Sequence, residues 1–347
     1  MSKLKVGIVG ASGYTGEELV RFLVRHPGAA LAQVASRTLA DVPLAKVFPQ
    51  YRESISPRLA FSAADAPSLA REAIDVWFLA LPHGVAASFA RAFVEAGRRV
   101  IDLSADFRLS TPELYKEYYD SEHSAPDLLV AAPYVLPELM QDDVWKQAPL
   151  IACPGCYPTS IQIPLVPLLR ANLIKPTPGS IVINSYSGIS GAGKKNETTY
   201  LFCEREGSVK AYGIPRHRHL SEIEENLSKA AKTPVIVQFN PHLAPMKRGI
   251  ATTITVPAPG ITTGQVYAIW EKAYEGRRFV GILPPGQHPD TAHVANSNRV
   301  DMSASIDPRT ENLIVTVAMD NLIKGAGGQA IQIMNLIAGF DEAEGLA

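Results

Sequence analysis

Continuous apolar runs alternate with amphipathic segments in the first half of the chain. Residues 4–10, LKVGIVG, are mostly apolar and end in glycine, as expected of a strand buried on both faces of a parallel sheet. In the next segment, GEELVRFLVRHPG, the apolar residues fall on one side of a helix that ends before residue 28. Further apolar runs occupy 29–36, 74–82 and 99–104, with a crossover helix over 86–97. The pattern predicts an α/β fold with a Rossmann-type, doubly wound parallel sheet.

The turn after the first strand has glycines at the spacing G-x-x-G-x-x-G. Glycine lets the backbone approach a pyrophosphate, and the amides at the start of the following helix point toward such an anion. The spacing alone is a weak signal, but a strand before it, a helix after it and a second strand at 29–36 strengthen it. We expect a dinucleotide to contact Gly10, Ser12, Gly13, Tyr14, Thr15 and Gly16.

The end of the second strand bears on the choice between NAD and NADP. An NAD site usually has Asp or Glu here to bind the ribose 2′-hydroxyl. This chain has Ser36 and Arg37, a hydroxyl followed by a cation, which suits a 2′-phosphate. Asp41 remains an alternative ribose ligand, and Arg37 an ordinary surface residue. The pair favours NADP.

Ligands of open α/β sheets bind beyond the carboxyl ends of the strands. Leu81 and Pro82 follow the strand at 74–82, and we expect them to line the cofactor site. Arg108 follows the strand at 99–104, where a guanidinium can bind a carboxylate or phosphate with two parallel hydrogen bonds. A structural ion pair is the alternative for Arg108.

Length and composition indicate two domains. The chain has 347 residues, 46% of them hydrophobic, which exceeds one ordinary core. A proline-rich stretch marks a boundary near residue 148, and a long apolar helix from about 326 is expected to pack back on the first domain. We therefore expect an NADP-binding domain of residues 1–148 and 326–347, with a second α/β domain, built on a mixed sheet, over 149–325.

The overall charge excludes some classes of partner. With 33 Lys+Arg against 34 Asp+Glu, the net charge of −1 provides no field that would recruit nucleic acid or an anionic membrane. No apolar run approaches the roughly 20 residues of a membrane span, and the first residues do not form a secretory signal. Three cysteines cannot build a disulfide framework, so we expect a cytoplasmic protein.

Two of the cysteines, Cys153 and Cys156, lie in the stretch IACPGCYPTSIQIP. Pro158 suits the first turn of a helix, so Cys156 would lie at or just before a helix N-terminus, where the dipole stabilises a thiolate. Because Pro164 and Pro167 follow, we expect that helix to be kinked or short.

The Cys-x-x-Cys spacing does not by itself identify the chemistry. A zinc site needs further ligands, and the third cysteine, Cys203, is far along the chain among charged residues, so no metal is expected. A thioredoxin-type dithiol would follow the first strand of its own small fold. One reactive thiol beside a nucleotide domain suggests attack on an acyl carbonyl followed by hydride transfer.

That chemistry requires a proton donor, and the stretch IPRHRHLSEIEE contains His217 and His219 between arginines. Ser221 and Glu224 have the spacing of a capping box, so we expect a helix to start there, with both histidines in the preceding loop. A neutral imidazole suits acid/base work near pH 7.

A second glycine-rich loop, residues 185–195, follows the strand SIVINSYS. Its amides and hydroxyls can cradle a nicotinamide or an acyl phosphate, although such loops also serve as turns. Asn321 ends another strand, NLIVTVAMD. We expect cofactor contacts from Ser187, Gly188 and Asn321.

The motifs GASGYTG, LALPHG, SADFRL, PGCYPT, SGAGK, HRH-x-x-E and DNLIKGA occur in this order. With them, the chain resembles the N-acetyl-γ-glutamyl-phosphate reductases of arginine biosynthesis from residue 5 to about 345. The resemblance implies that Cys156 is the nucleophile and that His219, or else His217, is the acid/base, with Glu222 orienting the histidine. It implies that NADPH reduces a Cys156 thioester of N-acetylglutamyl 5-phosphate, and that the protein is a homo-oligomer, a dimer or tetramer. We expect Arg108, Arg218 and Gly191 to contact the substrate.

Two other functions fit parts of the sequence. A reductase of N-acetyl- or carrier-bound aminoadipyl phosphate is similar throughout but tends to have G-C-N-A-T, whereas this chain has Tyr157 and Pro158 after the cysteine. A non-catalytic NADPH-binding redox sensor is the alternative from a different class. Cys153 stands where the family more often has asparagine, which raises the hypothesis of a reversible disulfide with Cys156.

Overall fold

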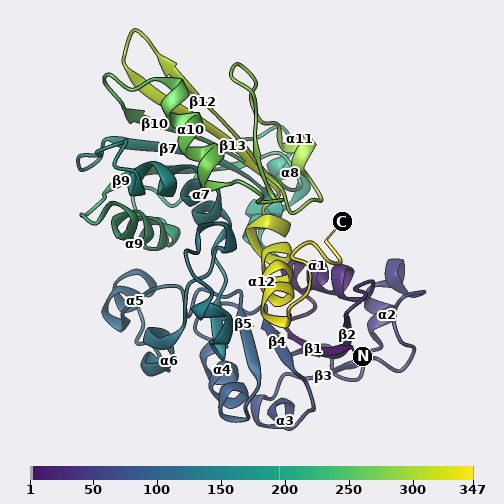
Figure 1. Cartoon of the computed structure of the whole chain (residues 1–347). Helices are drawn as coiled ribbons and strands as arrows, with labels where there is room; N and C mark the ends of the chain where they lie inside the picture. The colour runs from purple at the N-terminus through teal and green to yellow at the C-terminus, as the bar shows by residue number, and fades with distance from the viewer. Residues whose placement is uncertain (1–2, 195, 347) are drawn as a thin grey trace. The chain divides into compact units, whose positions relative to one another are not determined.

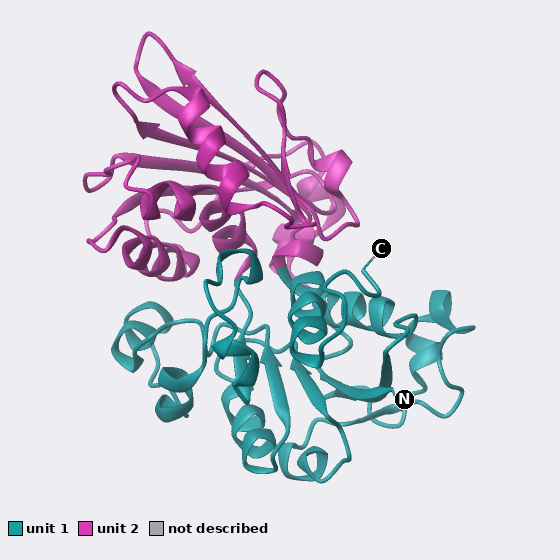
Figure 2. Cartoon of the chain, in the orientation of Figure 1, with its two compact units in different colours: residues 1–154, 326–347 teal, residues 155–325 magenta. Residues whose placement is uncertain are grey.

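The computed structural model describes residues 3–194 and 196–346. The chain divides into two compact units: residues 1–154 with 326–347 form unit 1, and residues 155–325 form unit 2 (Figure 2). The C-terminal segment therefore belongs to the same unit as the N-terminus.

Unit 1 is built on a six-stranded parallel sheet with the strand order β3-β2-β1-β4-β5-β6 (Figure 1). Its strands are β1 (Leu4–Val9), β2 (Ala29–Ser36), β3 (Phe61–Ala63), β4 (Val76–Leu79), β5 (Arg99–Asp102) and β6 (Leu150–Ala152). The order reverses between β1 and β4, and a crevice at the carboxyl ends of such a pair is where doubly wound folds bind ligands. This sheet confirms the predicted Rossmann-type class.

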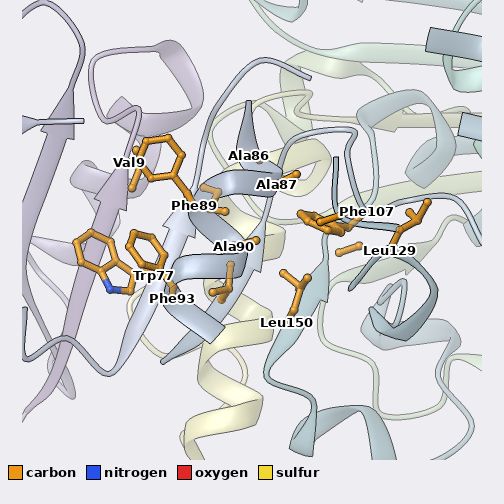
Figure 3. Close-up of a cluster of buried hydrophobic side chains, with 14 of the residues drawn as sticks. Val9, Trp77, Ala86, Ala87, Phe89, Ala90, Phe93, Phe107, Leu129 and Leu150 are labelled. Carbon is orange, nitrogen blue, oxygen red and sulfur yellow. The ribbon is translucent and has the colours of Figure 1, made fainter. Parts of the chain in front are cut away.

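The helices of unit 1 are α1 (Tyr14–Leu23), α2 (Leu44–Val47), α3 (Ala66–Ala70), α4 (Ala86–Glu95), α5 (Pro112–Tyr119), α6 (Pro126–Ala131) and α12 (Gly328–Ala338). Of these, α1, α4 and α12 pack against the sheet. All four residues of β4 are buried, as the apolar run predicted. Trp77 of β4 stacks on Phe93 of α4 with ring centroids 4.5 Å apart, in a cluster that also contains Phe89 and Leu150 (Figure 3). This core holds the strand ends at fixed positions.

Unit 2 contains a mixed seven-stranded sheet with the order β11-β12-β13-β10-β7-β9-β8 (Figure 1). Its strands are β7 (Ile181–Gly188), β8 (Lys210–Ala211), β9 (Val237–Ala244), β10 (Ile250–Pro257), β11 (Val280–Ile282), β12 (Val300–Asp307) and β13 (Asn312–Met319). β7 runs parallel to β9 and antiparallel to β10. This confirms the predicted second α/β unit with a mixed sheet.

The helices of unit 2 are α7 (Cys156–Arg170), α8 (Phe202–Arg205), α9 (His219–Ala231), α10 (Thr263–Ala273) and α11 (Thr291–Val294). α7 packs against α9, α10 and β10. From Tyr157 to Leu169 it is buried throughout. None of the helices in the described ranges is both long and apolar enough to cross a bilayer.

Of the two expectations for α7, kinked or short, the second does not hold, because α7 continues for 15 residues through Pro164 and Pro167. Proline at 167 removes the N–H that would normally bind the carbonyl of Ile163. The hydroxyl of Tyr274 donates to that carbonyl instead, and the indole N–H of Trp270 donates to the carbonyl of Pro164 at 2.9 Å. The hydroxyl of Tyr274 thus replaces the donor that Pro167 removes.

The chain reaches α12 through a π-helical turn, Ile323–Gly327. The helix expected from about residue 326 therefore starts in its α-form at Gly328. α12 packs against α1 and β5.

Candidate active site

The glycine turn of unit 1 connects β1 to α1. Gly10 has φ of +88°, and a Cβ there would lie 2.3 Å from the carbonyl oxygen of Ala80, so only glycine fits. Gly13 is the N-cap of α1 and has no side chain to satisfy the first amides. Tyr14, Thr15 and Gly16 form the first turn of that helix. The predicted turn residues therefore surround a helix N-terminus suited to a phosphate.

The structure brings Ser12 and Ser36 together. Their hydroxyl oxygens are 3.3 Å apart, and Ser36 Oγ also accepts the backbone N–H of Thr38 at 3.4 Å. Ser36 is buried at the end of β2, and Arg37 beside it is exposed. Polar hydrogen-bonding groups and one cation therefore meet where a doubly wound fold places the ribose.

Leu81 and Pro82, the two predicted cofactor contacts after β4, have different surroundings. The side chain of Leu81 lies 3.3 Å from the Cβ position of Gly10, so it borders the glycine turn. Pro82 is exposed.

Asp106 fixes the loop that follows β4, although it was not among the predicted site residues. It is fully buried, and its carboxylate accepts the backbone N–H groups of Gly84 at 2.6 Å and Ala86 at 2.9 Å and the hydroxyl of Tyr115 at 3.1 Å. The rule that drew attention to Arg108, a polar residue after a strand end, applies equally to Asp106. Its carboxylate fixes the loop between β4 and α4.

Arg108 donates to backbone carbonyls in unit 1. Its Nε donates to the carbonyl of Cys153 at 2.9 Å and its Nη2 to that of Leu103 at 2.8 Å. Arg108 thus holds two strand-end segments together through its guanidinium.

In the same unit, burial and the charge of Asp106 raise the pKa of the Asp102 carboxyl to about 7.

In unit 2, Cys156 is the first residue of α7. Its side chain is partly exposed, whereas the next 13 residues are buried. The helix dipole at this position favours the thiolate over the thiol. A Cβ on Gly325 would lie 2.6 Å from the Cβ of Cys156, so the close approach of the π-helical turn requires glycine. None of Cys153, Cys156 and Cys203 forms a disulfide.

Glu222 reaches the same helix terminus from α9. It is 1% exposed, and its Oε1 accepts the backbone N–H of Gly155, the N-cap of α7, at 2.7 Å. Local sequence patterns do not reveal this contact, because the two residues are 67 positions apart.

The expected start of α9 at Ser221 was wrong, since the helix begins at His219. The hydroxyl of Ser221 donates to the carbonyl of Arg218 at 2.8 Å, and the carboxylate of Glu224 accepts the N–H of Val237 at 3.0 Å. Neither side chain forms the predicted capping box. His219 consequently lies on the helix and not in the loop before it.

His217 packs among aromatic rings. Its centroid is 5.7 Å from that of Tyr157, 5.0 Å from His219 and 5.6 Å from Phe239. Burial and the charge of Arg218 lower the pKa of His217 to about 4. Its Nδ1 accepts the backbone N–H of His219 at 3.1 Å, so the ring is neutral at pH 7 and carries its proton on Nε2.

Tyr157, the residue after Cys156, contacts both histidine rings. Its hydroxyl accepts from Tyr212 at 3.0 Å and donates to the carbonyl of His242 at 3.4 Å. Burial raises the pKa of both phenols, which therefore stay protonated. In the sequence Tyr157 bore only on the choice of substrate class, and its contacts with the two histidine rings were not predicted.

The second glycine-rich loop is described over residues 185–194, and Lys195 lies outside the described residues. Asn321 holds this loop: its Oδ1 accepts the N–H of Gly249 at 2.7 Å and its Nδ2 donates to Ser190 Oγ at 3.0 Å. Ser187 and Gly188 are buried at the end of β7, whereas Gly191 and Arg218 are exposed. In the described ranges, no group of three or more His, Cys, Asp or Glu side chains is arranged to hold a metal ion.

Two family models match the chain. One, described as semialdehyde dehydrogenase, NAD binding domain, matches residues 5–147. The other, described as semialdehyde dehydrogenase, dimerisation domain, matches residues 156–321.

Curated relatives match almost the whole chain. A protein of Akkermansia muciniphila named N-acetyl-gamma-glutamyl-phosphate reductase is 48% identical over 347 residues, covering 100% of this chain and 99% of the relative. One of the same name from Desulforamulus reducens is 44% identical over 340 residues, covering 98% of this chain and 96% of the relative.

Solved structures share the fold. Aspartate semialdehyde dehydrogenase II of Vibrio cholerae, complexed with ASA, has a TM-score of 0.72 at 18% identity and covers 98% of this chain and 99% of its own. Aspartate semialdehyde dehydrogenase with NADP from Candida albicans has a TM-score of 0.70 at 16% identity, covering 97% of this chain and 99% of its own.

Proposed function

We propose a reaction for this chain, which belongs to the N-acetyl-γ-glutamyl-phosphate reductase family and is therefore an oxidoreductase. It reduces N-acetyl-L-glutamyl 5-phosphate to N-acetyl-L-glutamate 5-semialdehyde. NADPH is the reductant, phosphate is released, and the reaction belongs to arginine biosynthesis. The observation that carries the proposal is the partly exposed thiol of Cys156 at the N-terminus of a buried helix, next to a ring cluster with two histidines.

Cys156 is the nucleophile in this proposal. Its thiolate forms a C–S bond to the acyl carbon, the C–O bond to phosphate breaks, and inorganic phosphate leaves with the bonding pair. The thioester remains on the enzyme. The position of Cys156 at the start of α7 supports the role, because the helix dipole favours the thiolate both before attack and as the final leaving group.

His219 is the proton donor to the oxygen of the hemithioacetal that follows hydride addition. The surroundings of His217 support this assignment: with its pKa near 4 and its Nδ1 occupied by the His219 amide, it is poorly placed to take up a proton. His217 then holds the first residue of α9, from which the His219 ring extends. Collapse of the hemithioacetal returns this proton to His219, breaks the C–S bond and releases the aldehyde and the thiolate.

The residues of unit 1 fit a dinucleotide. The open N-terminus of α1 suits a pyrophosphate, and the paired hydroxyls of Ser12 and Ser36 with the exposed Arg37 suit a ribose 2′-phosphate. Bound NADPH would supply the hydride that reduces the thioester. Ser187, Gly188 and Asn321 in unit 2 remain candidates for contacting the nicotinamide.

Substrate recognition is assigned to two arginines and a glycine. Arg218, exposed beside the histidines, and Gly191 are the candidates in unit 2. Arg108 is also retained, although its Nε and Nη2 already donate to backbone carbonyls.

The protein is proposed to be a cytoplasmic homo-oligomer. The family model over 156–321 is described as a dimerisation domain, and large exposed apolar side chains gather within one segment of it. These are Leu201, Phe202, Val209, Tyr212 and Ile214. A second copy of the chain is the expected occupant of this surface. Sedimentation of the wild type and of Phe202→Asp tests this association, because the introduced charge should favour the monomer.

The reaction is tested with the purified chain by phosphate-dependent oxidation of two semialdehydes, N-acetylglutamate and N-acetylaminoadipate, with NADP or NAD. Preference for the first aldehyde and for NADP is expected. Cys156→Ser should abolish turnover, and Cys203→Ser, which removes an exposed thiol, is the matched control. Near-normal turnover of Cys156→Ser would refute the covalent mechanism.

A further inference from the structure

The N-terminus of α7 lacks the capping groups that a helix of 15 residues usually has. Its N-cap is Gly155, which has no side chain, and no side-chain cap is formed there. The third helical position, where a capping-box glutamate would accept the N-cap N–H, is Pro158. The residues of α7 itself therefore cannot satisfy the buried N–H of Gly155.

Glu222 supplies the missing acceptor from another helix. Its Oε1 is 2.7 Å from the nitrogen of Gly155, and its side chain is almost completely buried. A buried carboxylate is retained only where hydrogen bonds or charges offset its lost hydration. We propose that Glu222 is a positioning residue that caps α7 from α9 and thereby sets both the place and the acidity of the Cys156 thiol.

The same helix carries the proposed proton donor. His219 and Glu222 are three positions apart on α9, so they lie on the same side of it. α9 packs against α7, so one bond ties the segment that bears the nucleophile to the helix that bears the acid. The inference rests on the proposed function of Cys156 as nucleophile.

The charge of Glu222 has a second effect. The carboxylate binds one residue before Cys156, at the helix end whose dipole also favours the thiolate. A negative charge there disfavours a second one, so Glu222 holds the thiol pKa above the value that the helix alone would give. The effect of one nearby charge in a partly solvated site is on the order of one pKa unit.

The test measures alkylation of Cys156 by iodoacetamide from pH 5 to 10. The background is Cys203→Ser, because Cys203 is exposed, and peptide mass spectrometry confirms the labelled site. Glu222→Gln keeps an oxygen acceptor but removes the charge, and Glu222→Ala removes both. The matched control is Glu224→Gln, since Glu224 lies on the same helix and also accepts a backbone N–H, that of Val237 at 3.0 Å.

We expect Glu222→Gln to lower the alkylation pKa by about one unit and to move the acidic limb of kcat/KM by the same amount. Glu222→Ala should lower kcat at least tenfold, more than Glu222→Gln does, and Glu224→Gln should leave the alkylation pKa unchanged. If Glu222→Ala fails to fold, the glutamine variant still decides the question.

An unchanged alkylation pKa in Glu222→Gln overturns the inference. So does a loss of kcat in Glu222→Gln as large as in Glu222→Ala, because Glu222 would then transfer a proton itself. Alkylation does not require turnover, so these failures are distinguishable from failure of the proposed function, which Cys156→Ser reports.

Discussion

The change of His217 to asparagine tests how the fold of unit 2 holds a neutral imidazole. In the native protein, burial and the neighbouring Arg218 lower the pKa of His217 to about 4, against about 6.5 in an unfolded chain. Between these values the unfolded chain binds the proton more readily than the folded one. Folding stability therefore falls as the pH drops from 6.5 toward 4.

The magnitude follows from the two pKa values. The full shift of roughly 2.5 units corresponds to about 3 kcal/mol, and at pH 5 about 2 kcal/mol of stability should already be lost relative to pH 8. Asparagine does not titrate, and its side-chain oxygen can still accept the N–H of His219. The variant should therefore lose about 2 kcal/mol less than wild type between pH 8 and pH 5.

Urea denaturation, followed by circular dichroism and tryptophan fluorescence at both pH values, measures this difference. His293→Asn is the control, because His293 is exposed and the change should leave the pH dependence as in wild type. Equal pH dependence in wild type and His217→Asn would refute the reasoning. A histidine NMR signal that titrates near pH 6.5 and is absent from His217→Asn would refute it independently.

Two further changes test buried polar contacts. Burial raises the pKa of Asp102 to about 7, so the stability of the wild type should fall as the pH rises from 3.8 through 7. Asp102→Asn removes the titrating carboxyl and should therefore stabilise the protein more at pH 8 than at pH 4.5, as measured by thermal unfolding. Tyr274→Phe should cost about 1–3 kcal/mol in urea denaturation, because it leaves the carbonyl of Ile163 in α7 without its donor. No change in stability in Tyr274→Phe would mean that α7 does not need this hydrogen bond to accommodate Pro164 and Pro167.

The family and the fold class could be predicted from local features of the sequence. Strands β1 and β4 are apolar runs because both faces of a parallel sheet are covered, and the turn at Gly10 requires glycine because the carbonyl of Ala80 approaches it. The spacing of these signals along the chain indicates a doubly wound sheet. The ordered motifs extend the resemblance over both units.

Local patterns failed where the partner of a polar group is distant in sequence. Ser221 and Glu224 match a capping box, yet the carboxylate of Glu224 binds Val237, 13 residues away, and α9 begins earlier. The prolines of α7 left a short helix open as one of two expectations, because the sequence does not reveal that Tyr274, 111 residues from Ile163, supplies a hydrogen bond.

The sequence alone therefore determined the strands that are visible as apolar runs, among them β1, β4 and β13, and the candidate residues for the chemistry. Only the tertiary structure decided how those residues are held. Glu222 contacts Gly155, and Phe239 and Tyr157 surround His217, through packing between segments far apart along the chain. The physical reason is that periodicity and turn chemistry act over a few residues, whereas burial, which sets the acceptor of an amide and the pKa of an imidazole, depends on the whole fold.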